Sequence, residues 1–152
     1  MGKSFVWDLD GTLSNCDHRV DYAKAKDWPG FHARAKDDKP YPEAVALFHA
    51  ILTASAETDD ECIILTGRTE DHRNATMKWL SDNELFSSSL LMRAKLDFRP
   101  DYVIKLDALD QYFGGREFAL ESVYMIFEDR EQVVENLRNA GFVVAQVRNG
   151  AF

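Results

Sequence analysis

The sequence predicts an α/β protein with a doubly wound, mainly parallel sheet, and two observations support this prediction. Short apolar runs typical of buried strands alternate along the chain with segments whose apolar residues recur at helical spacing. No repeat, low-complexity segment or linker interrupts this alternation. The 152 residues, 45% of them hydrophobic, are enough for one domain with a proper core and too few for two ordinary ones. We therefore expect a single domain over residues 1–152.

The expected strands are short and apolar, and turn signals bound the first two. The run at residues 4–7 leads into an acidic turn, and the run at 61–65 ends at Thr66-Gly67-Arg68. The predicted strands cover residues 4–7, 61–65, 88–92, 122–127 and 142–147.

Helical spacing of apolar residues predicts the connecting helices. Pro42 suits a first helical turn, where its missing N–H would be unpaired in any case, and Gly141 suits the position just after a helix. The predicted helices cover residues 42–55, 72–83, 100 or 101 to 113, and 130–140. Residues 13–41 are the least regular part; we expect a helix around 28–36 there and either a small flap over the site or no cap at all.

Composition excludes several classes of function. The net charge of −8 argues against a protein that coats long stretches of duplex, because such binding neutralises many phosphates; binding one phosphate at a polymer end remains open. No run approaches the ~18 apolar residues of a membrane helix, and the N-terminus lacks the apolar stretch of a signal peptide. Cys16 and Cys62 have no metal-ligand spacing. We expect reduced thiols and a cytoplasmic protein without membrane contact.

The acidic turn after the first strand is the strongest functional signal. Asp8-Leu9-Asp10-Gly11-Thr12 places two carboxylates two residues apart, and Gly11 lets the backbone bend toward the crevice beyond the strand's carboxyl end. One carboxylate can attack phosphorus while its neighbour transfers the leaving-group proton. The alternative interpretation is a solvated turn.

Polar residues follow three further expected elements. Thr66 and Arg68 end the second strand, Lys105 lies one turn into a helix, and Glu128-Asp129-Arg130 ends the fourth strand. Each has an ordinary alternative interpretation when taken alone. Thr66-Gly67-Arg68 is a common strand-to-turn sequence, Lys105 could be a solvated helix residue, and Glu128-Asp129-Arg130 could cap a helix. The carboxyl ends of parallel strands share one edge of the sheet, so we expect the four sites to converge.

Together these residues predict a phosphoryl-transfer centre. Asp8 is the expected nucleophile and Asp10 the expected general acid and base. Thr66 would donate its hydroxyl to a phosphoryl oxygen, and Lys105 would neutralise charge on nucleophile and phosphate. Mg²⁺, which prefers oxygen ligands, would be held by Asp8, Asp129 and the backbone carbonyl of Asp10.

These residues resemble the four motifs of the haloacid dehalogenase superfamily of phosphatases. Asp8–Thr12 is similar to the first motif, Leu65–Arg68 to the second, Lys105 to the third and Glu128-Asp129 to the fourth. The resemblance implies a Rossmann-like haloacid dehalogenase fold, Mg²⁺ dependence and an aspartyl-phosphate intermediate.

A narrower resemblance is to the 3′-phosphatase domain of bacteriophage polynucleotide kinases. The segments that carry it are Arg19, Leu91-Met92-Arg93, Asp97, Arg99-Pro100-Asp101, Lys105 and the closing Gln146-Val147 with Gly150 and Phe152. It implies removal of a 3′-phosphate, or a 2′,3′-cyclic phosphate, from nucleic-acid ends in repair. The substrate-binding residues that we expect are Arg19, Gly67, Arg68, Asp101 and Arg130.

Two features depart from that phage family. Its fourth motif is usually Asp-Asp, whereas Glu128-Asp129 stands here. A Glu-Asp pair occurs in other members of the superfamily with the second residue on the metal, so the resemblance implies Asp129 as a direct ligand and Glu128 in an outer position. The second departure is that the sequence holds no kinase half. We expect phosphatase activity alone, as a monomer or homodimer, with a separate kinase or ligase as a partner.

Three functions stay open at this point. The first is a nucleic-acid 3′-end phosphatase, the second a phosphatase of mononucleotides or other small phosphate esters, and the third a non-catalytic phosphate-binding module. The short spacings between motifs leave room for a small flap only, which favours an open site and a bulky substrate. Trp28 and Phe31 are candidates for stacking on a terminal base, and Phe31 alternatively forms the apolar underside of the flap. Arg73 and Arg130 are further candidates for contacting phosphates that flank the reacting one. Alternatively, Arg73 is a helix-surface residue and Arg130 pairs with a carboxylate at a helix end.

Overall fold

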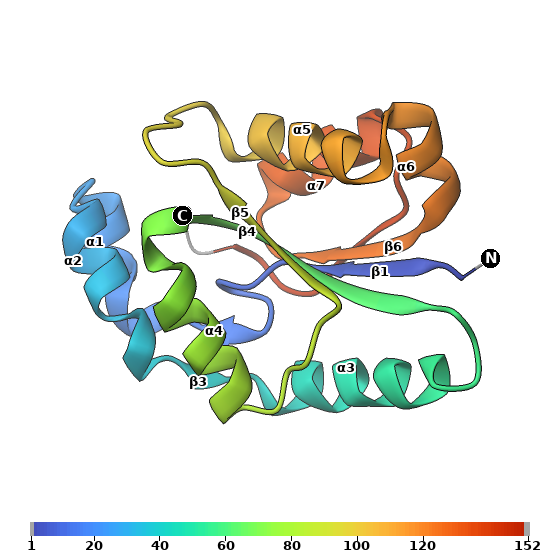
Figure 1. The fold of residues 1–152 in the computed structure, drawn as a ribbon. Coiled ribbons are helices and arrows are strands. Elements are labelled where there is room, and N and C mark those ends of the chain that lie inside the picture. Colours follow the sequence, from blue (N-terminus) through green and yellow to red (C-terminus); the bar gives the residue numbers. More distant parts are fainter. Residues whose placement is uncertain (1, 151–152) are drawn as a thin grey trace.

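A single parallel sheet forms the centre of the protein, whose computed structural model describes residues 2–150 (Figure 1). Its five strands lie in the order β5-β4-β1-β6-β7, and every pair is parallel. The strands are β1 (Ser4–Trp7), β4 (Glu61–Thr69), β5 (Ser89–Arg93), β6 (Val123–Glu128) and β7 (Val144–Gln146). All five expected strands are confirmed, with shifts at their ends.

Helices cover both faces of the sheet, as a doubly wound fold requires (Figure 1). The helices on one face are α3 (Pro42–Ser55) and α4 (Arg73–Asp82), and those on the other are α5 (Asp101–Phe113), α6 (Arg116–Ser122) and α7 (Glu131–Asn139). The sequence did not predict α6. This helix is short, and exposed Phe118 and Leu120 disturb its apolar spacing.

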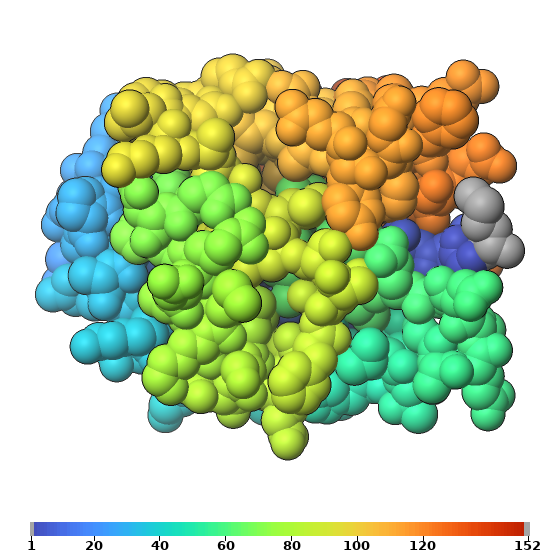
Figure 2. Space-filling view, viewed as in Figure 1, coloured from blue at the N-terminus to red at the C-terminus, as the bar shows by residue number. Residues whose placement is uncertain are grey.

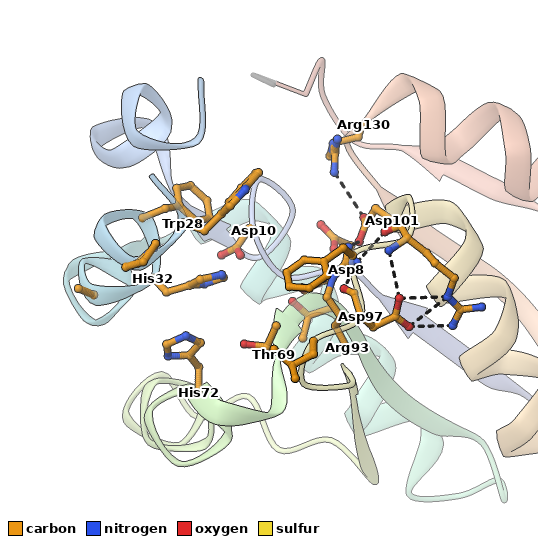
Figure 3. Close-up of a pocket in the computed structure, with 18 residues that line it drawn as sticks. Asp8, Asp10, Trp28, His32, Thr69, His72, Arg93, Asp97, Asp101 and Arg130 are labelled. Carbon is orange, nitrogen blue, oxygen red and sulfur yellow. Dashed lines mark hydrogen bonds and ion pairs between the residues drawn. The ribbon is translucent and has the colours of Figure 1, made fainter. Parts of the chain in front are cut away.

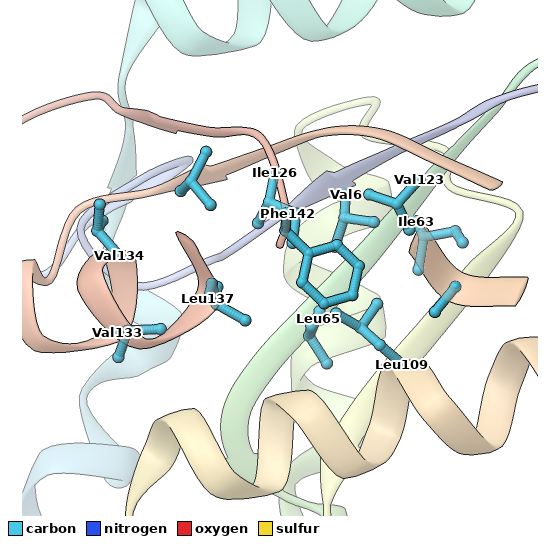
Figure 4. Close-up of a cluster of buried hydrophobic side chains, with 12 residues drawn as sticks. Val6, Ile63, Leu65, Leu109, Val123, Ile126, Val133, Val134, Leu137 and Phe142 are labelled. Carbon is cyan, nitrogen blue, oxygen red and sulfur yellow. The ribbon is translucent and has the colours of Figure 1, made fainter. Parts of the chain in front are cut away.

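The core consists of two apolar layers, one on each face of the sheet. Along β1, Val6 faces one layer and Trp7 the other, since successive side chains of a strand point to opposite faces. Figure 4 shows the first layer, where Val6 and Leu65 lie with Leu109 of α5 and Leu137 of α7. In the second layer the ring of Trp7 stacks on Phe127 with centroids 3.8 Å apart. Burial on both faces explains why the strands read as continuous apolar runs.

The irregular region 13–41 lies beyond the carboxyl end of β1 (Figure 1). Its elements are β2 (Ser14–Asn15), η1 (Asp17–Arg19), α1 (Val20–Lys24), α2 (Trp28–Ala33), η2 (Ala35–Asp37) and β3 (Lys39–Pro40). β2 and β3 pair as a small antiparallel ribbon. The helix expected around 28–36 is two elements: α2, capped by Asp27 through Gly30 N, and the separate turn η2.

Two further expectations from the sequence can be compared with the described residues. Cys16 and Cys62 are both buried free thiols. Among residues 2–150, no helix is long and apolar enough to cross a membrane.

Candidate active site

A cavity of about 690 Å³ opens beyond the carboxyl ends of β1, β4 and β6 (Figure 3). Figure 3 shows Trp28 and His32 of α2 on one side of it and Arg93, Asp97 and Asp101 on the other. Six of the expected catalytic, metal and substrate-binding residues line it: Asp8, Asp10, Thr66, Gly67, Asp101 and Arg130. Lys105 and the Glu128-Asp129 pair do not line the cavity but lie close to Asp8, so the four motifs converge at one edge of the sheet, as expected from parallel strands.

Two glycines allow the close approach of the motifs. Gly11 has a φ of 87°, a left-handed conformation that favours glycine, and a side chain there would collide with the Asp129 carboxylate. A side chain on Gly67 would collide with Asp101. β4 shifts register between Thr66 and Thr69 against β5, so the second motif leaves the regular ladder at the cavity.

Lys105 joins three of the motifs from behind the cavity. Its ammonium is buried and donates to Asp8 Oδ1 and Glu128 Oε2, each at 2.7 Å. It also pairs with Asp101 Oδ2, one helical turn earlier, at 3.1 Å. Burial alone would lower the pKa of Lys105, but the carboxylates of Asp101, Asp8 and Glu128 raise it well above its ordinary value. The ammonium is therefore a permanent positive charge beside Asp8.

Asp8, Glu128 and Asp129 form a buried cluster of carboxylates. One oxygen of each lies within 4.8 Å of the others. Burial, reinforced by the neighbouring carboxylates, raises the pKa of Asp8 to about 7 and that of Asp129 to about 9. Asp129 Oδ1 is buried without a hydrogen-bond partner among the described residues. An orphaned oxygen in a cluster of mutually repelling carboxylates fits a hard divalent cation.

Glu128 differs from Asp129 because hydrogen bonds within the protein already satisfy both of its carboxylate oxygens. Its Oε1 accepts hydrogen bonds from the backbone N–H groups of Asp129 and Arg130, at 3.0 and 3.1 Å. Its Oε2 accepts from Lys105. Glu128 therefore orients the turn that carries Asp129.

Asp10 is held by two buried arginines, Arg19 and Arg68. Arg68 donates to both of its oxygens, at 3.0 Å to Oδ2 and 2.5 Å to Oδ1, and Arg19 Nη2 donates to Oδ1 at 2.5 Å. Burial alone would raise the pKa of Asp10, but the guanidinium groups of Arg68 and Arg19 outweigh it and hold the pKa well below its ordinary value. Asp10 is thus an oriented carboxylate.

Asp38 completes this arrangement, and the sequence analysis missed it. Its carboxylate accepts from Arg19 Nε at 2.7 Å and from Arg68 Nη2 at 3.3 Å, and Ser14 Oγ donates to it at 2.6 Å. Arg19 and Arg68 are both buried, and neither is among the residues that line the cavity. Both contact Asp10, and their expected contact with substrate remains untested. Asp38 follows an unremarkable charged stretch, so no spacing signal in the sequence could have found it.

Other wall residues were also absent from the expected site. His32 of α2 and His72, which precedes α4, stack with ring centroids 4.5 Å apart. Phe98, in the loop after β5, lines the cavity as well. By contrast Arg73, a candidate for a flanking phosphate, pairs with Glu70 at 2.6 Å and does not line the cavity. Phe152 lies outside the described residues.

Comparisons with known proteins agree with this geometry. The family described as "Polynucleotide kinase PNKP phosphatase domain" matches residues 2–152. A comparison with curated protein sequences gave no match.

Solved structures with similar folds fall into two groups. A chain of the Pnkp1/Rnl/Hen1 complex is 27% identical with a TM-score of 0.78, over 100% of this chain and 47% of that chain. A second structure, of the Pnkp1/Rnl/Hen1 RNA repair complex, is also 27% identical, with a TM-score of 0.73 over 99% of this chain and 44% of that one. This chain therefore spans less than half the length of those relatives.

More distant structures share the fold alone. L-2-haloacid dehalogenase from Xanthobacter autotrophicus is 15% identical, with a TM-score of 0.60 over 97% of this chain and 78% of that chain. A phosphatase structure from Haemophilus somnus, described as a predicted phosphoglycolate phosphatase, is 16% identical with a TM-score of 0.62, over 95% of this chain and 84% of that chain. Because the family model matches nearly the whole chain, the chain belongs to the family of polynucleotide kinase PNKP phosphatase domains.

Proposed function

We propose that this protein is a Mg²⁺-dependent phosphomonoesterase that removes a 3′-phosphate, or a 2′,3′-cyclic phosphate, from nucleic-acid ends in repair. The single observation that carries the proposal is the position of Asp8, which accepts a hydrogen bond from Lys105 and lies beside the carboxylates of Glu128 and Asp129, with Asp10 of the same motif at the same cavity. Family membership supports the choice of a nucleic-acid end.

The first step is attack on phosphorus by the Asp8 carboxylate. A bond forms between Asp8 and phosphorus, the bond between phosphorus and the sugar 3′-oxygen breaks, and Asp10 gives that oxygen its proton. In the second step Asp10 takes a proton from a water molecule, whose oxygen attacks phosphorus; the bond between phosphorus and Asp8 breaks, which restores the Asp8 carboxylate and frees inorganic phosphate. Asp10 must gain its proton against the two arginines that hold it as a carboxylate.

Three further side chains support the reaction. Lys105 offsets the negative charge of Asp8 and of the incoming phosphate. Thr66 lines the cavity, and its hydroxyl can donate to a phosphoryl oxygen. Arg130 also lines the cavity and pairs with Asp101 at 3.6 Å, so its guanidinium could attract a phosphate that enters the cavity.

Asp8 and Asp129 are the proposed side-chain ligands of Mg²⁺, with the Asp10 carbonyl as a third ligand. When bound, the cation would neutralise charge on the transferring phosphoryl group and keep Asp8 unprotonated. The Asp10 side chain is engaged by Arg19 and Arg68, so its main chain, not its carboxylate, is the proposed donor. In this proposal Glu128 does not bind the cation directly but holds Asp129 in position by accepting a hydrogen bond from its backbone N–H.

The small size of residues 13–41 supports a polymeric substrate. We propose one domain in which these residues form a flap that covers the cavity from one side only, leaving space for a strand to continue outward. The similar chains are part of a complex with Rnl and Hen1, which supports a separate ligase or kinase as a partner of this protein in end repair.

The test is Mg²⁺-dependent phosphate release from a 3′-phosphorylated oligonucleotide, a 3′-mononucleotide and a 5′-mononucleotide, measured side by side. We expect the oligonucleotide 3′ end to be preferred in kcat/KM, and the Asp8→Asn variant to release no phosphate. Equal or better turnover of the mononucleotides would instead make the protein a nucleotide phosphatase with the same chemistry.

A further inference from the structure

We propose that Trp28 and Phe98 form an aromatic clamp at the mouth of the cavity, which stacks on the terminal base of the strand whose 3′-phosphate reaches Asp8. Trp28 lies at the start of α2 and Phe98 in the loop after β5, and both line the cavity. The inference rests on the proposed function and adds how the protein recognises a nucleoside next to the phosphate.

Phe98 is exposed yet held on a fixed loop. Its side chain is 88% exposed, although the transfer of a phenyl ring out of water is energetically favourable. Arg93 Nη1 donates to the carbonyl oxygens of both flanking residues, at 3.0 Å to Asp97 and 2.7 Å to Arg99. Ordering this loop therefore costs little when a ligand arrives, and the exposed ring is available for stacking.

The same loop bends sharply to present its apolar side chains. Leu96 has a φ of 62°, an unfavourable conformation for this residue, and is 74% exposed while lining the cavity. In the space-filling view the loop, drawn in yellow, lies at the same end of the molecule as the blue residues of the flap (Figure 2). The cavity thus has one lip from the loop and one from the flap.

Trp28 supplies the other lip and is anchored from below. It is 47% exposed, and its ring packs edge-on against Phe31, with centroids 5.9 Å apart and an interplanar angle of 87°. Phe31 is buried, with the Arg19 guanidinium 4.0 Å from its ring centroid. Both aromatic candidates in the sequence line the cavity, but Phe31 is buried and supports Trp28, so Trp28 is the ring exposed enough to stack on a base.

Stacking of this kind does not select a particular base. Every base offers a flat π face, whereas reading its edge requires donors and acceptors such as asparagine or glutamine. Neither residue type occurs among the described residues that line the cavity. Arg99, which does line it, is paired with Asp97 and Asp107. Stacking on the clamp itself therefore accepts any terminal nucleotide.

The experiment compares two 3′-phosphorylated oligonucleotides that differ only at the last residue, one with a base and one with an abasic sugar. The assay compares wild type with Trp28→Ala, Phe98→Ala and the control Phe86→Ala. Phe86 is also an exposed aromatic residue (60%), but it does not line the cavity. We expect wild type and Phe86→Ala to prefer the base-carrying end by about 5- to 150-fold in kcat/KM, and Trp28→Ala and Phe98→Ala to lose most of that preference. Retention of the wild-type preference in both clamp variants would overturn the clamp.

A binding measurement separates this inference from the proposed function. Trp7 and Trp79 are buried, so changes in tryptophan fluorescence on binding would come mainly from Trp28. We expect the base-carrying oligonucleotide to quench the fluorescence of the Asp8→Asn variant and the abasic one to leave it nearly unchanged. Phosphate release by wild type without such a difference would keep the proposed function and overturn the clamp. Quenching by the base-carrying end without phosphate release by wild type would support the clamp and contradict the proposed function.

Discussion

The Lys105 ammonium lies 2.7 Å from Asp8 Oδ1, although the two residues are 97 positions apart in the sequence. The lysine reaches the carboxylate from the first turns of α5, behind the sheet edge, and both groups are buried. This contact fixes one oxygen of Asp8 and offsets part of the repulsion from Glu128 and Asp129. Its removal would affect both the chemistry and the fold.

We expect Lys105→Ala to lower kcat by at least ~10²-fold, because a preorganised positive charge beside the nucleophile is lost. The same change leaves Asp8, Glu128 and Asp101 without their shared cation, so the Tm should also fall. Steady-state kinetics and thermal unfolding, with Lys78→Ala as a surface control, measure the two effects. A variant with near wild-type kcat would contradict the role given to Lys105.

Asp8→Asn is expected to abolish turnover and, without metal, to raise the free energy of unfolding. The amide cannot form the phosphoryl intermediate, but it removes one charge from a cluster whose carboxylates repel one another. Phosphate release and denaturant unfolding in EDTA check the two halves. Residual turnover above background would refute the nucleophile, and a less stable metal-free variant would show that the pairing with Lys105 outweighs the repulsion.

Much of this site was predictable from the sequence because parallel strands bring their carboxyl ends to one edge. Asp8, Thr66 and Asp129 could be placed from the apolar runs that precede them, since each run identifies a strand and each strand fixes the position of its end. Lys105 was harder, since a lone lysine on a helix usually faces water. Three carboxylates stabilise the charge of this buried lysine, and no local pattern in the sequence reveals the two that come from distant parts of the chain.

The parts that the sequence missed depend on tertiary contacts in irregular segments. Asp38 meets Arg19 and Arg68 only because the ribbon of β2 and β3 closes the flap on itself. Phe98 belongs to a loop whose shape is set by hydrogen bonds from Arg93 to main-chain carbonyls. Neither segment has the periodicity from which a strand or helix is identified.

Metal removal should make stability depend on pH in a defined direction. Because the pKa of Asp129 is raised from 3.8 to about 9 and that of Asp8 to about 7, the folded protein binds protons that the unfolded chain has released. This contribution to stability is fully present below the ordinary carboxyl pKa and is lost as the pH rises through the raised values. We expect the free energy of unfolding in EDTA to fall between about pH 5 and 9, by at most about 1.4 kcal/mol per pH unit for each group.

Saturating Mg²⁺ should flatten that dependence, because the cation favours the ionised carboxylates. Denaturant unfolding at a series of pH values, with and without Mg²⁺, makes the comparison, and Asp129→Asn should flatten the metal-free curve as well. Asp10 contributes no slope in this range, since its pKa is held far below it. A metal-free curve that is level or rises toward pH 9 would show that the cluster does not carry the excess protons.

Arg19→Gln should move the alkaline limb of the kcat profile to higher pH. Arg68 and Arg19 both hold down the pKa of Asp10, so removing one guanidinium raises that pKa and keeps the protonated acid populated at higher pH. An opposite charge at this range lowers a carboxyl pKa by roughly one to three units, so we expect a shift of about one unit or more. The control is Arg73→Gln, whose arginine pairs with Glu70 away from Asp10. If the limb stays in place for Arg19→Gln, a group other than Asp10 supplies the proton to the leaving oxygen.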